Sequence, residues 1–337
     1  MKKVYRLLEQ WVDQKLIPSA VLCINYQDTL IVNHAFGSAH IDTIYDIASL
    51  TKVTATLPSI LLLMQASKLA LDDRLVTHIP TFPHRDITIR HCLQHMTGLP
   101  GSLPYPQDRY ATKNVWDDIY AQPLISKPGS IVRYSDLGMI WLGKVIENIS
   151  GQSLSAYAQK HIYTPLNMQD TAFLPQLPEM NGRIAPTEWD DVNKQYLQGA
   201  VHDEVSYRLG GVSGSAGLFS TAKDLSNYAR AWLYPMDYAL FTTDSINQCF
   251  KLPIEARGLG WQVQDFTVPL ACGENWPKGS FGHTGFTGTS IWIEPHKKLS
   301  VVLLTNAVHY GRQNKIVELR RQLHELIYDE VLNSVLD

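Results

Sequence analysis

The sequence has few cysteines, no marked excess of either charge and no long apolar run. Its 4 cysteines in 337 residues are scattered without a C-x-x-C pair, so the pattern supports neither a structural zinc site nor a disulfide, and buried free thiols are expected. The 29 basic and 32 acidic side chains give a net charge of −3, which argues against nucleic acid as a partner. No stretch reaches the apolar length of a membrane span.

The N-terminus also lacks the pattern of a signal peptide. Residues 1–17 instead predict an amphipathic helix, with Val4, Leu7, Leu8, Trp11 and Val12 on its apolar face. A cytoplasmic location is therefore the plain expectation, and an extracytoplasmic one if a leader has been removed. With 45% hydrophobic residues, the chain can bury a large core as one large domain or two.

The most informative pattern in the chain is Ser49-x-x-Lys52. Residues i and i+3 share a face of an α-helix, so the Lys52 amine can reach the Ser49 hydroxyl. The apolar run 53–64 predicts a buried helix, and burial lowers the pKa of a lysine. We therefore expect a neutral amine beside a serine, which is a base beside a nucleophile. The alternative is a serine N-cap with a lysine that extends to the surface.

A second copy of this spacing, Ser220-x-x-Lys223, predicts a structural feature instead. Thr221 and Asp224 have the spacing of a capping box, and the residues that follow alternate as on an amphipathic helix. Because this lysine lies in a polar first turn, nothing in the pattern would desolvate it.

Two further segments contain polar groups next to regular structure. Tyr134-Ser135-Asp136 precedes a helical pattern, and by itself it is typical of an N-cap made by Asp136. The glycine-rich segment 282–288 runs into an alternating strand, 289–294, which turns and returns as 299–305. By itself, this segment is typical of a bulged or tightly packed strand.

Together and in this order, the three segments resemble the penicillin-recognising serine hydrolases. The resembling branch contains class C β-lactamases, DD-peptidases, esterases and D-aminopeptidases, and one subgroup includes penicillin-binding protein 4B. The resemblance covers nearly the whole chain and is based on three motifs: Ser49-x-x-Lys52, Tyr134-Ser135-Asp136 and His283-Thr284-Gly285. Flanking segments that also match are Tyr45-Asp46-Ile47-Ala48, His95-Met96-Thr97-Gly98-Leu99, Ala216-Gly217-Leu218-Phe219-Ser220-Thr221-Ala222 and Leu303-Leu304-Thr305-Asn306. The similarity to the subgroup is carried by Val201-His202-Asp203-Glu204 and Leu209-Gly210-Gly211.

The resemblance implies an α+β fold of the β-lactamase/transpeptidase type, in which an antiparallel sheet flanked by helices is joined to a mainly helical subdomain. It implies a single catalytic domain, 1–337, whose α/β subdomain is built from 1–64 and 251–337. Residues 65–250 would form the helical and loop subdomain, with the site between the two.

The resemblance also implies a role for each motif residue. Ser49 would be the nucleophile, with Lys52 and Tyr134 sharing the proton transfer. The backbone N–H groups of Ser49 and Phe286 would form the oxyanion hole, and Gly285 would let substrate approach the strand edge. Asp136, His283 and Thr284 would line the substrate site. No cofactor or metal is implied.

Two departures from the β-lactamase pattern make this site less positive. His283 stands where lysine is usual, and an unperturbed histidine is mostly neutral at pH 7. Asp136 stands where asparagine is usual, and an ionised carboxylate can only accept hydrogen bonds. Carboxylate-bearing substrates should therefore bind less well than neutral esters or cationic amines. Arg312 is predicted to be a surface arginine, and a charge that restores positive potential in the site is its alternative.

Several alternatives stay open at this point. The substrate is a small ester, a peptide or a β-lactam, and the sequence does not choose among an esterase, a D-amino-acid peptidase or DD-carboxypeptidase, and a weak β-lactamase. A non-catalytic, penicillin-binding-like recognition module would be expected to lack Ser49, Lys52 or Tyr134, which are all present. His202 and Asp203 either line the cleft or cap a loop. The main rival from another chemistry is a metal site. The residues of the rival metal site are His84, His91, Cys92 and His95.

Overall fold

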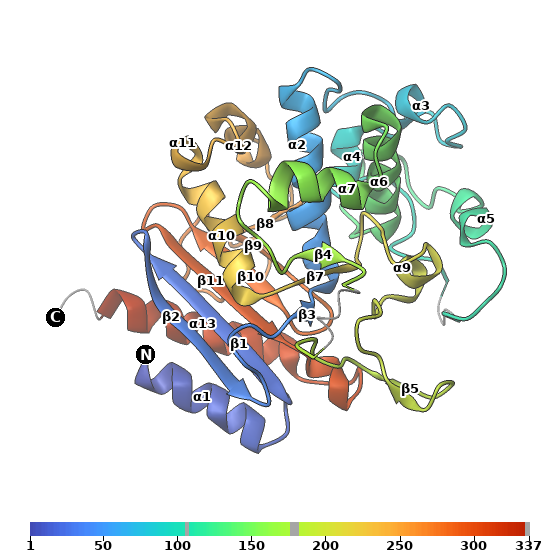
Figure 1. Cartoon of the computed structure of the whole chain (residues 1–337). Helices are drawn as coiled ribbons and strands as arrows, with labels where there is room; N and C mark the ends of the chain where they lie inside the picture. The colour runs from blue at the N-terminus through green and yellow to red at the C-terminus, as the bar shows by residue number, and fades with distance from the viewer. Residues whose placement is uncertain (105–107, 176–181, 334–337) are drawn as a thin grey trace.

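A six-stranded antiparallel sheet forms the centre of the protein in a computed structural model, which describes residues 1–104, 108–175 and 182–333. The strand order is β2-β1-β11-β10-β9-β8, so both ends of the chain contribute to one sheet (Figure 1). The strands are β1 (Ser19–Tyr26), β2 (Thr29–Gly37), β8 (Gln262–Val263), β9 (Phe281–Thr284), β10 (Ser290–Glu294) and β11 (Leu299–Thr305).

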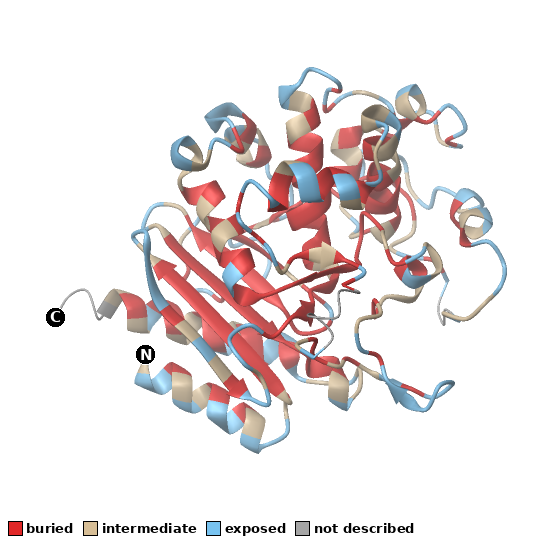
Figure 2. Cartoon of the chain, in the orientation of Figure 1, coloured by how far each residue is buried: buried red, intermediate tan, exposed pale blue. Residues whose placement is uncertain are grey.

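The sequence predicts two hairpins, 20–26 with 30–36 and 289–294 with 299–305, and both are present. The first joins β1 to β2, and the second joins β10 to β11, with Glu294 paired to Leu299. Strand β1 is buried on both faces because helices cover the sheet on each side (Figure 2). Its residues alternate, so that Val21 and Cys23 face one apolar cluster while Leu22 and Ile24 face another.

Helices from the two ends of the chain cover one face of the sheet (Figure 1). They are α1 (Lys2–Asp13) and α13 (Ile316–Asn333). Val4, Leu8 and Trp11 of α1 are buried, and Leu7 and Val12 are partly buried against the same cluster, which confirms the apolar face predicted for this helix. The spacing of three and four residues places them on one stripe, and α13 packs beside it.

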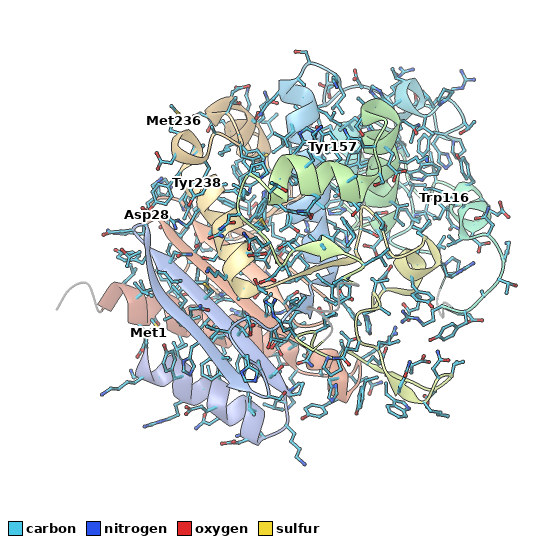
Figure 3. The ribbon with its side chains drawn as sticks, viewed as in Figure 1. Met1, Asp28, Trp116, Tyr157, Met236 and Tyr238 are labelled. Atoms are coloured by element: carbon cyan, nitrogen blue, oxygen red, sulfur yellow. The ribbon has the colours of Figure 1, made fainter. Side chains whose placement is uncertain are left out.

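The other face of the sheet is covered by the helical half of the chain. Its longest helices are α2 (Leu57–Gln65), α6 (Asp136–Ser150) and α10 (Ala222–Leu233). Trp116 of α5 packs on Trp141 of α6 with ring centroids 5.4 Å apart, at the outer side of this half (Figure 3). The remaining helices are α3 (Leu75–His78), α4 (Ile89–Leu93), α5 (Val115–Tyr120), α7 (Leu154–Ala158), α9 (Glu204–Arg208), α11 (Pro235–Tyr238) and α12 (Thr243–Phe250).

Short strands connect this half to the main sheet. A three-stranded sheet has the order β3-β7-β4, and β5 pairs with β6 as a separate hairpin. The pairing of Tyr45 with Ser220 brings the segment before Ser49 against the segment before α10. The strands are β3 (Tyr45–Asp46), β4 (Ala172–Phe173), β5 (Trp189–Asp190), β6 (Gln195–Tyr196) and β7 (Leu218–Ser220).

The second Ser-x-x-Lys copy is structural, as predicted. Thr221 is the N-cap of α10, and its side chain accepts a hydrogen bond from the Asp224 N–H at 3.2 Å. In a full capping box the Asp224 carboxylate would accept from the Thr221 N–H. Here it accepts from the Thr171 hydroxyl and the Asp170 N–H instead. Lys223 is exposed.

These observations confirm the α+β fold class, with its antiparallel sheet, flanking helices and helical half. The subdomain boundaries at 64 and 251 stay a prediction. All 4 cysteines are buried free thiols, as expected. Within the described ranges, no helix is long and apolar enough to cross a membrane.

Candidate active site

The backbone around Ser49 departs from the predicted α-helix. Ala48–Leu50 is a 3₁₀ turn and Lys52–Thr56 is a π-helical turn, and the α-helix α2 begins only at Leu57. Such π turns are frequent at functional sites. The segment is buried as predicted, and Lys52 Nζ donates to Ser49 Oγ at 2.9 Å. The pairing inferred from the spacing is therefore present, although the helix type is different.

A strained residue precedes the serine. Ala48 has a φ of 47°, in the left-handed region that costs a non-glycine residue roughly 1–2 kcal/mol. The buried Asp46 carboxylate holds this conformation by accepting the Ala48 N–H at 2.8 Å, and its other oxygen accepts the His202 N–H at 2.7 Å. Asp46 therefore links the serine turn to the segment that carries His202.

Lys52 is fully buried and uses all three of its donor hydrogens. Its ammonium group donates to Ser49 Oγ at 2.9 Å, to the Ser215 carbonyl at 2.8 Å and to Asp136 Oδ1 at 2.7 Å. Burial by itself lowers the pKa of Lys52, but the charge of Asp136 and the Tyr134 phenol outweigh it and hold this pKa above its usual value. The prediction of a neutral amine is wrong, because a carboxylate faces the buried lysine.

Tyr134-Ser135-Asp136 lies at the start of α6. Ser135 is the N-cap, and its hydroxyl accepts from the Gly138 N–H at 3.4 Å. The interpretation of Asp136 as the cap is wrong, since it occupies the first helical position and its carboxylate faces Lys52. The Ser135 N–H donates to His95 Nδ1 at 3.1 Å, so His95 helps to fix the turn that carries Tyr134.

Four side chains surround the Tyr134 ring. Lys52 Nζ lies 5.0 Å and Arg257 Cζ 5.3 Å from the ring centroid. The rings of His95 and His283 lie at centroid distances of 4.6 and 6.0 Å. Arg257 was not identified from the sequence, and His95 was named only in a matching flanking segment and as a rival metal ligand. No local spacing marks either residue as a neighbour of the tyrosine.

His283 is neutral, as predicted. Burial, followed by the charges of Arg257 and Lys52, places the pKa of His283 well below its usual value. Its Nδ1–H donates to the Thr284 carbonyl at 2.8 Å, which leaves Nε2 as an acceptor with no partner among the described residues.

Gly285 and Phe286 begin the turn between β9 and β10. A Cβ atom on Gly285 would lie 2.1 Å from Thr289 Oγ1 and 2.5 Å from the Ile47 carbonyl oxygen. The glycine is therefore required by packing against the serine segment, whereas the sequence predicted that it admits substrate. Phe286 is 54% exposed, and its ring stacks on His202 at 5.6 Å.

These segments enclose a pocket of about 350 Å³. Ser49, Tyr134, Asp136 and Phe286 line it, while the side chains of Lys52 and His283 are buried outside its wall. The other lining residues are Ala48, His202, Asp203, Glu204, Ala216 and Arg312. A larger hollow of about 820 Å³ includes Gln94 and Phe250 in its lining and contains no residue of the three motifs.

A model of the family described as Beta-lactamase matches residues 4–325. The chain belongs to the beta-lactamase family. A protein from Escherichia coli (strain K12) named "Putative D-alanyl-D-alanine carboxypeptidase" is 30% identical over 355 residues, covering 90% of this chain and 82% of that protein. The family is one of serine hydrolases, and the resemblance found in the sequence is confirmed.

Solved structures of the beta-lactamase fold match nearly the whole chain. EstCE1, described as a hydrolase with promiscuous acyltransferase activity, gives a TM-score of 0.78 at 22% identity and covers 96% of this chain and 97% of its own. A class C beta lactamase from Rhodobacter sphaeroides gives 0.74 at 16% identity, covering 97% and 99%. At these identities the matches show the fold.

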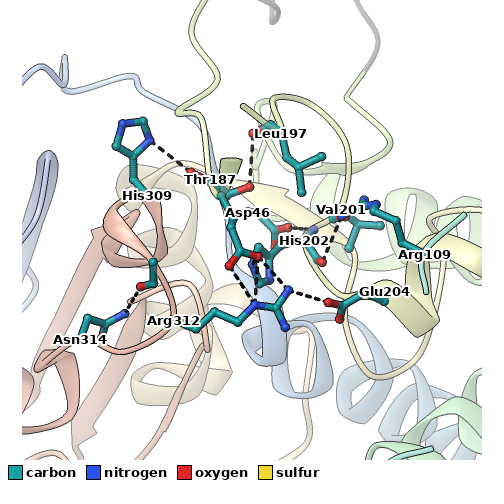
Figure 4. Close-up of polar contacts among 12 residues, drawn as sticks. Asp46, Arg109, Thr187, Leu197, Val201, His202, Glu204, His309, Arg312 and Asn314 are labelled. Carbon is teal, nitrogen blue, oxygen red and sulfur yellow. Dashed lines mark hydrogen bonds and ion pairs between the residues drawn. The ribbon is translucent and has the colours of Figure 1, made fainter. Parts of the chain in front are cut away.

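The rim of the pocket in this family member is an ion-pair network (Figure 4). Arg312 binds Glu188 at 2.7 Å and Glu204 at 2.5 Å, and His202 Nε2 lies 3.0 Å from Glu188. The prediction of a surface arginine is wrong, because Arg312 lines the pocket with 30% of its side chain exposed. Its charge faces two carboxylates, so Arg312 does not restore positive potential in the site either.

Asp203 combines the two roles that the sequence left open. It is the N-cap of α9, where its Oδ1 accepts the Ser206 N–H at 2.7 Å, and it also lines the pocket. Burial and the nearby charge of Asp136 raise the pKa of Asp203. His202 lines the same pocket.

The histidines of the rival metal site have other partners. His91 Nδ1 accepts the Thr88 N–H at 3.3 Å, His95 Nδ1 accepts from Ser135, and His84 Nε2 lies 2.9 Å from the Gln122 carbonyl. Within residues 1–104, 108–175 and 182–333, no group of three or more histidine, cysteine, aspartate or glutamate side chains is arranged to hold a metal ion.

Proposed function

We propose that this chain is a serine hydrolase that cleaves an ester or amide through an acyl-enzyme on Ser49. The observation that carries this proposal is the hydrogen bond of 2.9 Å from Lys52 Nζ to Ser49 Oγ beside a pocket that Tyr134 also lines. A hydroxyl at a pocket wall with a proton-transfer group in reach is the minimum equipment for nucleophilic catalysis.

The charge of Lys52 assigns the first proton transfer. A protonated amine cannot accept the Ser49 proton, so we assign its acceptance to the Tyr134 side-chain oxygen, with the positive charge of Lys52 stabilising both oxygens. Ser49 Oγ then bonds to the substrate carbonyl carbon, and the carbonyl electron pair moves to its oxygen. Collapse of this intermediate breaks the bond to the leaving group, which receives the proton from Tyr134. Water repeats the sequence to release the acid and free Ser49.

The negative charge on the tetrahedral intermediate would be bound by two backbone donors, the N–H groups of Ser49 and Phe286. Ser49 follows the strained Ala48, and Phe286 follows Gly285, which packs on the carbonyl of Ile47. The two peptide segments therefore contact each other, which supports a shared oxyanion hole.

The charges around the pocket favour a neutral or cationic substrate. Three carboxylates, Asp136, Asp203 and Glu204, line the pocket against one arginine, Arg312. Asp136 is paired with Lys52, and Arg312 is paired with both Glu204 and Glu188. His283 is neutral because burial lowers its pKa. A substrate carboxylate would meet no unpaired cation among these lining residues, so we propose an ester or an amine-bearing amide as the substrate class.

A D-alanyl-D-alanine carboxypeptidase is the second candidate, and the name of the relatives at about 30% identity favours it. A weak β-lactamase activity belongs to the same candidate, because both substrates carry a carboxylate. The rival non-catalytic module is disfavoured, since Ser49, Lys52 and Tyr134 all lie at one site.

Covalent labelling tests the proposal. A fluorophosphonate should add one mass equivalent to the wild type and none to Ser49→Ala, while Ser220→Ala should be labelled like the wild type. Labelling that survives Ser49→Ala would contradict the assignment of the nucleophile.

Turnover of three substrates then tests the substrate class. We expect kcat/KM for a neutral p-nitrophenyl ester to exceed that for nitrocefin and for an acyl-D-Ala-D-Ala peptide. Preference for the peptide would favour the carboxypeptidase instead.

A further inference from the structure

A buried arginine contacts the turn that carries Phe286. Arg320 of α13 is 5% exposed, and its Nη1 donates to the Gly285 carbonyl at 2.9 Å and to the Thr289 carbonyl at 2.8 Å. No ion pair joins Arg320 to a carboxylate of the described residues. Burial lowers the pKa of Arg320 to about 10, which still leaves it charged at neutral pH. A buried charge without a counter-charge is costly, so a role beyond packing is expected.

The position of this contact matters because of peptide geometry. The Gly285 carbonyl and the Phe286 N–H belong to one peptide unit, which is planar and trans, so the two groups point in opposite directions. A hydrogen bond that fixes the Gly285 carbonyl therefore also fixes the direction of the Phe286 N–H. The Gly288 N–H donates to the same carbonyl at 3.1 Å, and the Gly285 N–H donates to Thr289 at 2.7 Å. Arg320 thus binds both ends of a closed turn.

The serine side of the site has a parallel arrangement. The Ala48 carbonyl, which shares a peptide unit with the Ser49 N–H, accepts from the Thr51 hydroxyl at 2.6 Å. Each of the two proposed oxyanion donors is thus oriented through the carbonyl behind it. The group that donates to the Gly285 carbonyl is a cation, Arg320, which also polarises the peptide and strengthens the Phe286 N–H as a donor.

We propose that Arg320 is a positioning residue of the oxyanion hole, which aims the Phe286 N–H through the Gly285 carbonyl and supplies positive charge behind it. This inference rests on the proposed acyl transfer at Ser49, but the orientation of the peptide can be tested without turnover. Loss of a whole oxyanion donor lowers kcat by about 10²–10³-fold, so misalignment of one donor should cost about 10–100-fold.

The kinetic test compares Arg320→Met with Arg321→Met. Arg321 is the next residue on α13, is 37% exposed and pairs with Glu274 and Glu325, so its variant removes the same charge from the same helix. We expect Arg320→Met to lower kcat for the neutral ester by about 10–100-fold with KM changed by less than about threefold. Arg321→Met should stay within twofold of the wild type. A folded Arg320→Met protein with wild-type kcat overturns the proposal.

The structural test uses the chemical shift of one peptide unit. Gly285-Phe286 is the only Gly-Phe pair in the sequence, so carbonyl-¹³C-glycine with ¹⁵N-phenylalanine labels a single Gly-Phe peptide bond. In Arg320→Met both the Gly285 carbonyl and the Phe286 amide resonances should move, and in Arg321→Met neither should. Unchanged resonances in Arg320→Met overturn the proposal even if the protein proves to have no hydrolase activity.

Arg320→Lys completes the design, and it carries the test if the methionine variant does not fold. Lysine keeps the charge but has one nitrogen on a differently shaped end, so kcat and both resonances should fall between those of the wild type and Arg320→Met. If Arg320→Lys equals the wild type in both measurements, the guanidinium is not needed. If a folded Arg320→Met also equals the wild type, the proposal fails altogether.

Discussion

At the scale of single residues, the ion pair between Lys52 and Asp136 defines the chemistry of this site. Lys52 is completely buried, and its partner at 2.7 Å, Asp136, is 28% exposed at the pocket. Removing one partner of such a pair is costly because the other charge is left buried and uncompensated. The aspartate in the second motif therefore keeps the lysine positively charged, which is why we propose Tyr134 as the group that accepts the Ser49 proton.

Lys52 and Tyr134 should behave as one catalytic unit. Lys52→Met, Tyr134→Phe and the double variant should each lower kcat by roughly 10³-fold or more, with little additional loss in the double variant. Pre-steady-state acylation by a p-nitrophenyl ester measures this, and Lys223→Met is the matched control, since that exposed lysine belongs to the structural copy of the motif. Near-native acylation by Tyr134→Phe would reduce the tyrosine to a packing role.

The charges of His283 and Asp136 should set the preference for substrate charge. His283→Lys makes the site about one unit more positive, and Asp136→Asn does so as far as Lys52 keeps its proton. A charge pair at about 4 Å is worth roughly 1–4 kcal/mol depending on screening. We expect the ratio of kcat/KM for a penicillin to that for a neutral ester to rise a few-fold to tenfold. The ratio is the right measure because Asp136→Asn also removes the partner of Lys52. A flat ratio at two ionic strengths in folded, active variants would contradict the prediction.

At the scale of elements, two irregular turns packed against each other build the site. The 3₁₀ turn at 48–50 and the turn at 285–289 are joined by bonds from Thr289 Oγ1 to the Ile47 carbonyl at 3.1 Å and from Thr287 Oγ1 to the Asp46 carbonyl at 2.7 Å. Near the two proposed oxyanion donors, hydrogen bonds from side-chain hydroxyls thus take the place of the backbone hydrogen bonds between regular strands. The spacing between these donors depends on this contact.

Gly285→Ala tests that contact. The new Cβ would overlap Thr289 Oγ1 and the Ile47 carbonyl, so the turns must separate, at a cost of about 1–3 kcal/mol in the free energy of unfolding. We expect a loss of activity larger than the loss of stability explains, measured by urea unfolding and ester turnover on the same samples. Gly182→Ala is the control, because its Cβ would meet nothing within 4 Å. Wild-type activity in Gly285→Ala would show that the contact does not set the site.

At the scale of the whole molecule, the Glu188 network joins distant parts of the chain at the pocket rim. Glu188 precedes β5, Glu204 begins α9, and Arg312 lies between β11 and α13. Burial by itself raises the pKa of Glu188, but hydrogen bonds from His202 and Arg312 outweigh it and lower this pKa to about 2. The network is therefore a pH-dependent link between the sheet half and the helical half.

The lowered pKa of Glu188 predicts the direction of acid sensitivity. The stabilisation is fully present above the unfolded-state pKa of about 4.3 and is lost as pH falls through the folded-state pKa of about 2. Urea unfolding at pH 5, 4, 3 and 2 should show Glu188→Gln losing less stability on acidification than the wild type, by roughly 3 kcal/mol at most. Glu274→Gln, whose carboxylate is 78% exposed, should follow the wild type. Parallel curves for wild type and Glu188→Gln would contradict the prediction.

The sequence by itself determined the regular elements and the three motifs. Periods of two and of three to four residues predicted the β1–β2 and β10–β11 hairpins and the helix α1, because a residue's face in a strand or helix follows from its local position. The reach from Lys52 to Ser49 was predicted for the same reason, since Lys52 is three positions after Ser49. The beta-lactamase fold followed from the order of the motifs.

Only the tertiary structure decided the electrostatics and the supporting contacts. The charge of Lys52 depends on Asp136, the pairing of Arg312 depends on Glu188 and Glu204, and these partners lie far apart in the chain. Arg257 reaches Tyr134 and Arg320 reaches Gly285 in the same way. A pKa or a hydrogen bond depends on which groups meet after folding, and no local spacing encodes that meeting.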